Sequence, residues 1–515
     1  MRQPALGALG WFRWIWRQLT SMRTALLLLL ILAVGAIPGS AFPQRSIDAT
    51  RTAQWLMDHP MAGPVLDRLG FFEVYASPWF AAIYLLLFTS LVGCVIPRTR
   101  LHLRALRSRP PRAPRFPERL GSGVSMEVDG TPEDVLEDWR TTLSAARYRT
   151  DLNDDASVSA EKGYLKETGN LVFHVALIGI IVGVAIGHLW GFKGDVILPT
   201  GQTFANTLSR YDTFSPGPQV DGSDLEPWTL TLDRFDAVFE TDTTAHEQIG
   251  MARDFTAYVA FAREPGAPAE DRTIKVNHPL ETGNGSVFLL GNGYAPHITV
   301  RDAKGTVLYS DATPFLAQDN NYKSVGAVKV PGASPQGLGF AGLFLPTGEI
   351  TEQGPISIFP QPLDPHLALT VFEGELFPGG RPQSVYSLDT SAMTQIKAEG
   401  GDQPIRLWIR AGETMELPGG RGSITFDGVE RWAGLSVRTD PGKTLTLIAA
   451  LLALAGLIAM LTVRRRRVFV RATALEPGAD GAPRTLVRIG GLSKDDDDGM
   501  TDEITDLVAR QKDRR

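Results

Sequence analysis

Two histidines and one cysteine are the residues of this chain whose types could bind iron or carry a proton at a membrane. His174 and His188 lie in the uncharged stretch "GNLVFHVALIGIIVGVAIGHLWG", residues 169–191. Its apolar part is about 20 residues long, enough to cross a bilayer at roughly 1.5 Å per residue. A titratable ring in hydrocarbon is costly, so each histidine needs a physical reason to be there.

The two histidines differ in the reasons that their positions offer. His188 stands beside Trp190 near one end of the stretch, where a residue of the membrane interface is expected. His174 lies three residues after Leu171. Four roles stay open for it: snorkelling to the headgroups, a hydrogen bond between helices, ligation of haem or another metal, and proton relay. No other predicted spanning segment contains a histidine, so a haem with two histidine ligands would need the second from a partner protein.

Glycines recur every four residues along the same stretch, at Gly179, Gly183, Gly187 and Gly191. This spacing of small residues lets another helix approach closely. At roughly 100° per residue the glycines form a narrow stripe, and His174 lies approximately opposite it. We therefore expect Gly179, Gly183 and Gly187 to serve in helix packing.

Cys94 is the only cysteine, which excludes an intramolecular disulfide, a CxxC redox pair and a CxxCH haem-attachment site. It is either a small buried residue or a group with thiol or iron chemistry. Four further histidines lack metal-ligand spacing such as HExxH: His246, His278, His297 and His366. With no GxSxG elbow, Walker loop or dinucleotide fingerprint, the sequence predicts no catalytic residue and no metal beyond haem iron.

Four apolar runs predict the helices that must position these residues: 24–42, 79–96, 171–190 and 445–463. Arginines precede the first run, eight arginines with one acid follow the second, and "RRRR" follows the fourth. The positive-inside rule then places both termini in the cytoplasm and the segment between the third and fourth helices outside. A cleaved signal peptide is the alternative interpretation of the first run.

The remaining segments have contrasting compositions. We expect residues 1–23 in the cytoplasm or at the interface, 43–78 as an extracytoplasmic loop, and 464–515 as a largely disordered cytoplasmic tail. The cytoplasmic segment 97–168 should begin as an extended Pro/Arg-rich linker. A capped helix should start after Thr131, near a strand pair around "VSMEVDG" and "YRTDL".

Residues 192–440 contain runs of alternating polarity bounded by turn residues, such as "TLTLDRF" and "LALTVFEG". "RDAKGTV" and "RAGETME" have hairpin character. We predict a mainly antiparallel sandwich or barrel-like domain. The fold class is therefore a polytopic α-helical membrane protein with four transmembrane helices and a large β-rich extracytoplasmic domain between helices 3 and 4. The net charge of −6 gives no reason to expect a nucleic-acid partner.

Five stretches, in this order, resemble the ResB-like cytochrome c biogenesis proteins of the system II pathway. They are "LTSMRTALLLLLILAVGAIPGSAFPQR", "SLVGCVIPR", "KGYLKETGNLVFHVALIGIIVG", "IKVNHPLETGNGSVFLLGNGYAPHITVRD" and "WAGLSVRTDPG". The resemblance covers about Trp16 to Val470. It implies a multi-pass protein of the bacterial plasma membrane that works with a polytopic partner of the ResC or CcsA type. The pair would carry haem across the membrane and present it to the CxxCH of an exported apocytochrome c.

The resemblance also implies roles for single residues. His174 matches a histidine that binds haem together with a partner histidine in fused family members, so the haem would be transient and shared. Cys94 matches an "SLxxC" pattern of uncertain role, and His188 has no firm counterpart; both are weak candidates for haem binding. The tryptophan-rich haem-handling motif of ResC-type proteins is absent, which implies a non-autonomous subunit of a haem-attachment complex. The alternatives are a membrane-anchored binding or scaffold module without cofactor, and a transporter subunit with His174 as proton relay. Membrane lipids are partners in every case.

Overall fold

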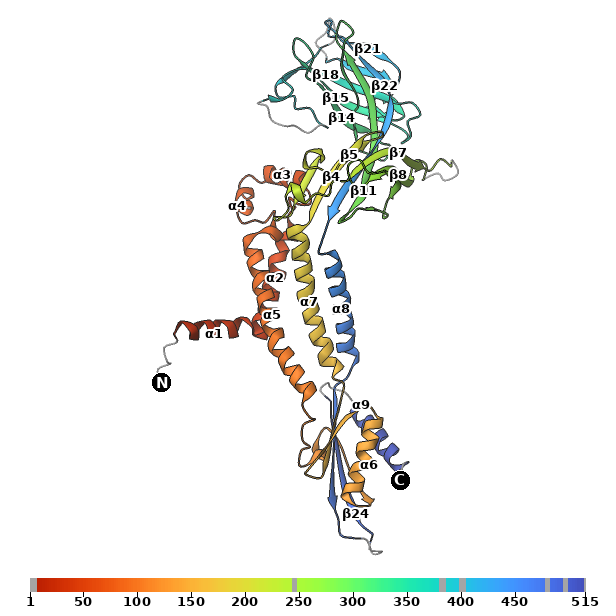
Figure 1. Ribbon diagram of the computed structural model, residues 1–515. Coiled ribbons are helices and arrows are strands. Elements are labelled where there is room, and N and C mark those ends of the chain that lie inside the picture. The colour runs from red at the N-terminus through yellow and green to blue at the C-terminus, as the bar shows by residue number, and fades with distance from the viewer. Residues whose placement is uncertain are drawn as a thin grey trace. The chain divides into compact units, whose positions relative to one another are not determined.

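A computed structural model gives the fold of this protein (Figure 1). It describes residues 7–242, 248–378, 386–397, 404–477, 482–493 and 499–513, without the side chains of residues 49 and 50. The chain divides into two compact units, Met1–Gly183 with Thr444–Arg515, and Val184–Lys443.

Four helices of the described chain are long and apolar enough to cross a membrane. They are α2 (Met22–Ala41), α5 (Pro78–Arg107), α7 (Leu165–Trp190) and α8 (Lys443–Thr462). Each coincides with one of the four predicted runs, because about 20 consecutive apolar residues favour a helix whose backbone groups are satisfied internally.

The prediction of an extended linker from residue 97 is wrong for its first part, because α5 continues to Arg107 with Pro97 inside it. The Thr99 hydroxyl donates a 2.8 Å hydrogen bond to the Val95 carbonyl next to this proline. Arg104 and Arg107 occupy the last turn, where positive charge favours the helix dipole. Arginine is a good helix former, so this basic composition extends the helix.

The segment between α2 and α5 folds as a small helical loop with α3 (Ala49–Asp58), α4 (Gly63–Arg68) and a short 3-10 turn at Val74–Ala76. Gln44 is buried there and satisfies three backbone groups. Its amide nitrogen donates to the carbonyls of Phe42 and Phe71, and its oxygen accepts from the Val74 N–H. The "PQR" of the first quoted stretch is therefore a structural motif.

A five-stranded antiparallel sheet joins the segment before α7 to the chain after α8. Its order is β1-β24-β23-β3-β2. The strands are β1 (Ser122–Asp129), β2 (Arg149–Asn153), β3 (Ser157–Lys162), β23 (Arg466–Ala474) and β24 (Arg484–Ser493). Helices α6 (Pro132–Ala145) and α9 (Gly499–Lys512) pack on it around Trp139. The predicted cap is confirmed, since the Thr131 side chain accepts from the Asp134 N–H.

Two predictions about this part of the chain are wrong. The described residues of 464–515 form β23, β24 and α9 and are not disordered, because the apolar residues between the charges, such as Val468, Phe469 and Val470, are buried. The acidic run at 495–498 lies outside the described residues. The strands β1 and β2 exist but do not pair with each other; β1 pairs with β24 and β2 with β3.

The region between α7 and α8 is β-rich, and each ladder between its named strands in the described chain is antiparallel. A seven-stranded sheet contains β4 (Phe192–Pro199), β6 (Thr213–Pro216), β10 (Leu280–Glu281), β11 (Gly285–Arg301), β12 (Val307–Ala312), β21 (Thr414–Glu416) and β22 (Ser423–Thr439). A four-stranded sheet contains β5 (Thr203–Ala205), β7 (Thr229–Phe239), β8 (Ala252–Ala262) and β9 (Glu270–Lys275). A six-stranded sheet contains β13 (Leu316–Ala317), β14 (Ser324–Val330), β15 (Gly337–Leu345), β18 (His366–Gly374), β19 (Met393–Gln395) and β20 (Arg406–Arg410), and β16 (Gly348–Thr351) pairs with β17 (Gly354–Ser357).

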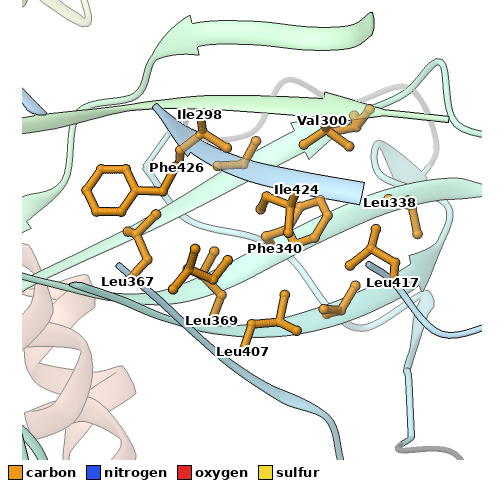
Figure 2. Packing of buried hydrophobic residues seen from close by; sticks show 14 of the residues in the cluster. Ile298, Val300, Leu338, Phe340, Leu367, Leu369, Leu407, Leu417, Ile424 and Phe426 are labelled. Carbon is orange, nitrogen blue, oxygen red and sulfur yellow. The ribbon is translucent and has the colours of Figure 1, made fainter. Parts of the chain in front are cut away.

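The strands β11 and β22, each 17 residues long, pair along their whole length and contribute to two hydrophobic cores. In the first core, Ile298 and Ile424 from this pair pack against Phe340 and Leu369 of the six-stranded sheet (Figure 2). "RDAKGTV" forms the predicted hairpin between β11 and β12. "RAGETME" does not, because β20 and β21 on its two sides pair with β18 and β22.

Candidate functional site

The helix α7 that carries both membrane histidines packs against α8 through small residues. The buried residues of α8 are Ala449, Ala453 and Gly456. A Cβ atom on Gly169 of α7 would lie 2.6 Å from the Gly456 carbonyl oxygen, and one on Gly456 would lie 2.7 Å from the Gly169 oxygen. The two backbones therefore touch here without side chains between them. Sequence reasoning missed this crossing, although the small residues of α8 at spacings of four and three were its signal.

The glycines of the predicted stripe have different surroundings. A Cβ on Gly179 would lie 3.1 Å from the Ala449 Cβ. Gly183 is buried, and Gly187 lies against the carboxylate of Asp440, which belongs to the segment before α8. Of these contacts, the one between Gly179 and Ala449 joins α7 to another helix.

Replacing Gly169 by valine should separate α7 from α8 at the crossing. Added methyl groups would meet backbone atoms that cannot rotate away, and overpacking of this kind costs about 1–3 kcal/mol.

Asn170 and Met460 are in contact beside the crossing, with 2.9 Å between Nδ2 and Sδ. In a Cys94→Ser background, cysteines at these two positions should be cross-linked by a short bis-maleimide, and less so with Gly169→Val. Ala185→Val, on an exposed part of α7, is the control; equal cross-linking in both variants would refute the crossing.

The imidazole of His174 is half-buried and is held in one tautomer. Its Nδ1 lies 2.7 Å from the Asn170 carbonyl oxygen. A carbonyl oxygen only accepts, so Nδ1 carries a hydrogen; in the neutral ring this leaves the lone pair on Nε2. Ligand histidines in metalloproteins commonly donate their other ring N–H to a carbonyl group in this way. The Phe173 ring stands edge-on to the imidazole, with 5.3 Å between the ring centroids.

The direction of His174 follows from the helix period. Ala176 is buried, as is Gly169, which contacts α8. His174 is two residues before Ala176, about 200° around the helix, so its ring points away from that packed side. The neighbouring Val175 is 49% exposed. The Nε2 side of the ring therefore lies on the side of α7 away from α8, and the chemistry of an imidazole there fits one axial ligand to a haem iron.

The other predicted candidates lie elsewhere. His188 is exposed in the last turn of α7. The Cys94 thiol donates a 2.8 Å hydrogen bond to the Thr20 carbonyl. Among the described residues, neither His188 nor Cys94 forms a hydrogen bond or ring contact with His174. Sequence reasoning did not consider His102, which lies on the extension of α5 and whose Nε2 is 2.9 Å from the Thr168 hydroxyl.

The histidines of the β-rich region have structural partners where they are described. His297 bonds to Asp427 at 3.3 Å, and the buried His366 stacks on Trp408 with 4.5 Å between centroids. His278 bonds through Nδ1 to the Val276 carbonyl oxygen, and His246 lies outside the described residues. No group of three or more His, Cys, Asp and Glu residues within the described ranges could hold a metal ion.

These features define a class: a protein with four helices long and apolar enough to cross a membrane, a large β-rich region between the third and fourth, and, on the third, a histidine whose Nδ1 is bonded to a backbone carbonyl of its own helix. A sequence model of the ResB-like family matches residues 22–505. The chain belongs to the ResB-like family.

Several relatives carry the name cytochrome c biogenesis protein CcsB. The protein of Trichormus variabilis is 27% identical over 268 residues, which cover 51% of this chain and 54% of that protein. The protein of Thermosynechococcus vestitus is 26% identical over 289 residues, 55% of this chain and 61% of its own length. The chain thus spans between half and two thirds of the length of these two relatives. A protein of Synechococcus sp. strain CC9311 is 25% identical over 508 residues, covering 96% of this chain and 98% of the relative.

Proposed function

We propose that this chain is the membrane subunit of a system II cytochrome c biogenesis complex, acting in haem transfer across the membrane and in haem attachment to exported apocytochrome c. Family membership and the names of the relatives support the pathway. The observation that supports a direct part in haem handling is the His174 tautomer, with its Nε2 lone pair on the side of α7 away from α8.

None of the other three apolar runs, 24–42, 79–96 and 445–463, contains a histidine, so the second axial ligand would come from a polytopic partner of the CcsA or ResC type. Haem is the cargo of this pair rather than a resident group. The residues of this chain have three tasks at the site. His174 offers Nε2 to the iron, the Asn170 carbonyl keeps the hydrogen on Nδ1, and α8 supports α7 from behind through Gly456.

The charge pattern supports the orientation of the chain. The exposed arginines of α5 and the sheet after α8 belong on the cytoplasmic side of the plasma membrane, and the β-rich region belongs outside. In this orientation His174 lies in the inner half of the bilayer, where haem arriving from the cytoplasm enters. The β-rich domain then faces the exported apocytochrome.

A maturation assay tests this function. The chain, a CcsA-type partner and an exported reporter with a CxxCH motif are produced in a bacterium that lacks its own c-type maturation. We expect covalent haem on the reporter only when both proteins are present, and none on a control reporter with both cysteines changed to serine. Equal haem attachment without this chain would contradict the proposal, and a cofactor-free scaffold would support attachment without any Soret absorbance in the purified complex.

A further inference from the structure

The N-terminal helix α1 (Ala8–Leu19) has a continuous apolar side that is exposed over most of its length. At roughly 100° per residue, six large apolar residues fall within an arc of about 160°. They are Leu9, Trp11, Phe12, Ile15, Trp16 and Leu19. Leu9 is 74% exposed and Phe12 is 65% exposed. The opposite side carries Arg13 and Arg17, with the exposed Trp14 beside them.

The position of α1 along the chain fixes what can cover this side. Two residues, Thr20 and Ser21, separate it from α2, the first apolar helix. The Thr24 hydroxyl donates to the Gln18 carbonyl across this turn at 2.6 Å. The apolar side of α1 must therefore lie within a few ångströms of the level where α2 enters the bilayer.

Three residues of α5, Ser90, Gly93 and Cys94, form a contact surface for this turn, called the seat below. The Ser90 hydroxyl donates to the Leu19 carbonyl at 2.6 Å, and the Cys94 thiol donates to the Thr20 carbonyl at 2.8 Å. Between them Gly93 leaves the space that the Thr20 side chain occupies. These two bonds satisfy carbonyls at the end of α1, and the helix runs across the direction of α2 and α5 (Figure 1).

Charge supports a lipid occupant. Arg13, Arg17 and Arg23 form no ion pair within the described ranges, nor do Arg98, Arg100 and Arg104 at the same end of α5. Exposed arginines without acidic partners, next to tryptophans, are typical of the headgroup region of an anionic leaflet.

We propose that α1 lies in the plane of the membrane surface, with its apolar arc among the acyl chains and Arg13 and Arg17 at anionic headgroups. Ser90, Gly93 and Cys94 form the seat that fixes its angle to α2. An amphipathic helix with arginines on one side and aromatic residues on the other binds an interface in this way. Cys94 then has a structural role, independent of haem.

Site-directed spin labelling of the full chain in nanodiscs with anionic lipid tests this proposal. In a Cys94→Ser background, which keeps the donor to Thr20, single cysteines are placed at Phe12, Arg13, Ile15 and Arg17. Collision with oxygen should exceed collision with a water-soluble nickel chelate for labels at 12 and 15, and the order should reverse at 13 and 17. Labels at 12 and 15 that collide more with nickel would overturn the proposal. So would labels shielded from both reagents, which would mean a protein occupant.

The seat has its own test in the same samples. With the label at position 15, Ser90→Ala combined with Cys94→Ala should increase label mobility relative to Cys94→Ser alone. Unchanged mobility would show that these two side chains do not hold the helix.

Discussion

Replacing Glu161 by alanine should unfold the sheet that joins α7 and α8. The Glu161 side chain is 3% exposed and accepts from Arg465 Nη2 at 3.0 Å, with Arg467 Nε at 2.6 Å from its other oxygen. Arg465 is itself 7% exposed and lies over the Tyr164 ring at 3.5 Å. Removing the carboxylate leaves a buried guanidinium without its main partner, which costs about 3–5 kcal/mol. That is a large part of the roughly 5–15 kcal/mol that stabilises a typical domain.

The same network fixes the ends of both helices, so the effect should reach the membrane. Gly163 has a φ of +88° and lies directly against the Arg464 carbonyl, where a side chain would not fit. Lys162 and Arg466 both pair with Glu503 of α9. Burial alone would raise the pKa of Glu503, but the hydrogen bonds from these two residues outweigh it and hold that pKa below its ordinary value.

Hydrogen exchange of the full chain in nanodiscs measures this effect. Amides of β3 and β23 should exchange much faster in Glu161→Ala, while those of α2 stay unchanged. Glu127→Ala is the matched control, because Glu127 and Arg484 form a pair in which both side chains are about half exposed. Such a pair is worth about 1 kcal/mol or less. Similar exchange in Glu161→Ala and the wild type would show that the buried pair does not stabilise the sheet.

Replacing His174 by alanine should remove most of the haem that copurifies with the complex and most of the holocytochrome c. Loss of a residue behind a metal ligand already costs about 10–100-fold in affinity, so loss of the ligand should cost about tenfold or more. The protein level should stay the same, because the side chain bonds only to the Asn170 carbonyl of its own helix in the described contacts. His174→Met offers a thioether ligand and should keep part of the haem with a changed spectrum.

His188→Ala is the control for this substitution, since His188 is exposed at the other end of α7. It should keep both haem and holocytochrome yield. If His174→Ala kept the wild-type yield at equal protein level, His174 would not be a ligand. If both variants lost haem equally, the loss would reflect damage to α7.

Local sequence patterns predicted the elements whose causes are local. The four apolar helices follow from composition, the start of α6 from the Thr131 cap, and the β11–β12 hairpin from its turn. Pairings between distant segments could not be predicted, because the alternation of apolar and polar residues along a strand does not determine which strand it pairs with. The strand β24 pairs with β1 more than 350 residues earlier, as Gly491 opposite Ser122 shows. The charge-rich composition of the tail suggested disorder, although the burial of β24 alternates at Thr485, Val487 and Ile489 as in a strand with one buried face.

The candidate site was predicted to a similar extent. His174 stands out from the sequence as a titratable residue in the uncharged stretch 169–191. Its tautomer required the position of the Asn170 carbonyl, which a helical turn brings to Nδ1. Cysteine is a common iron ligand, so the sequence left a role in iron binding open for Cys94. Its structural role became clear only from its hydrogen bond to the Thr20 carbonyl, 74 residues away. Gly169 and Gly456 approach each other through the pairing of two helices, which periodicity along one helix does not give.

The most direct test is the absorbance spectrum of the purified complex, measured oxidised and reduced and normalised to protein. The complex of this chain with the proposed CcsA-type partner should show the sharp bands of a low-spin haem with two strong axial ligands. Neither protein purified alone should show them, and the complex with His174→Ala should lose them while His188→Ala keeps them. The same low-spin spectrum in the His174→Ala complex, at equal amounts of both proteins, would contradict a haem held between His174 and the partner.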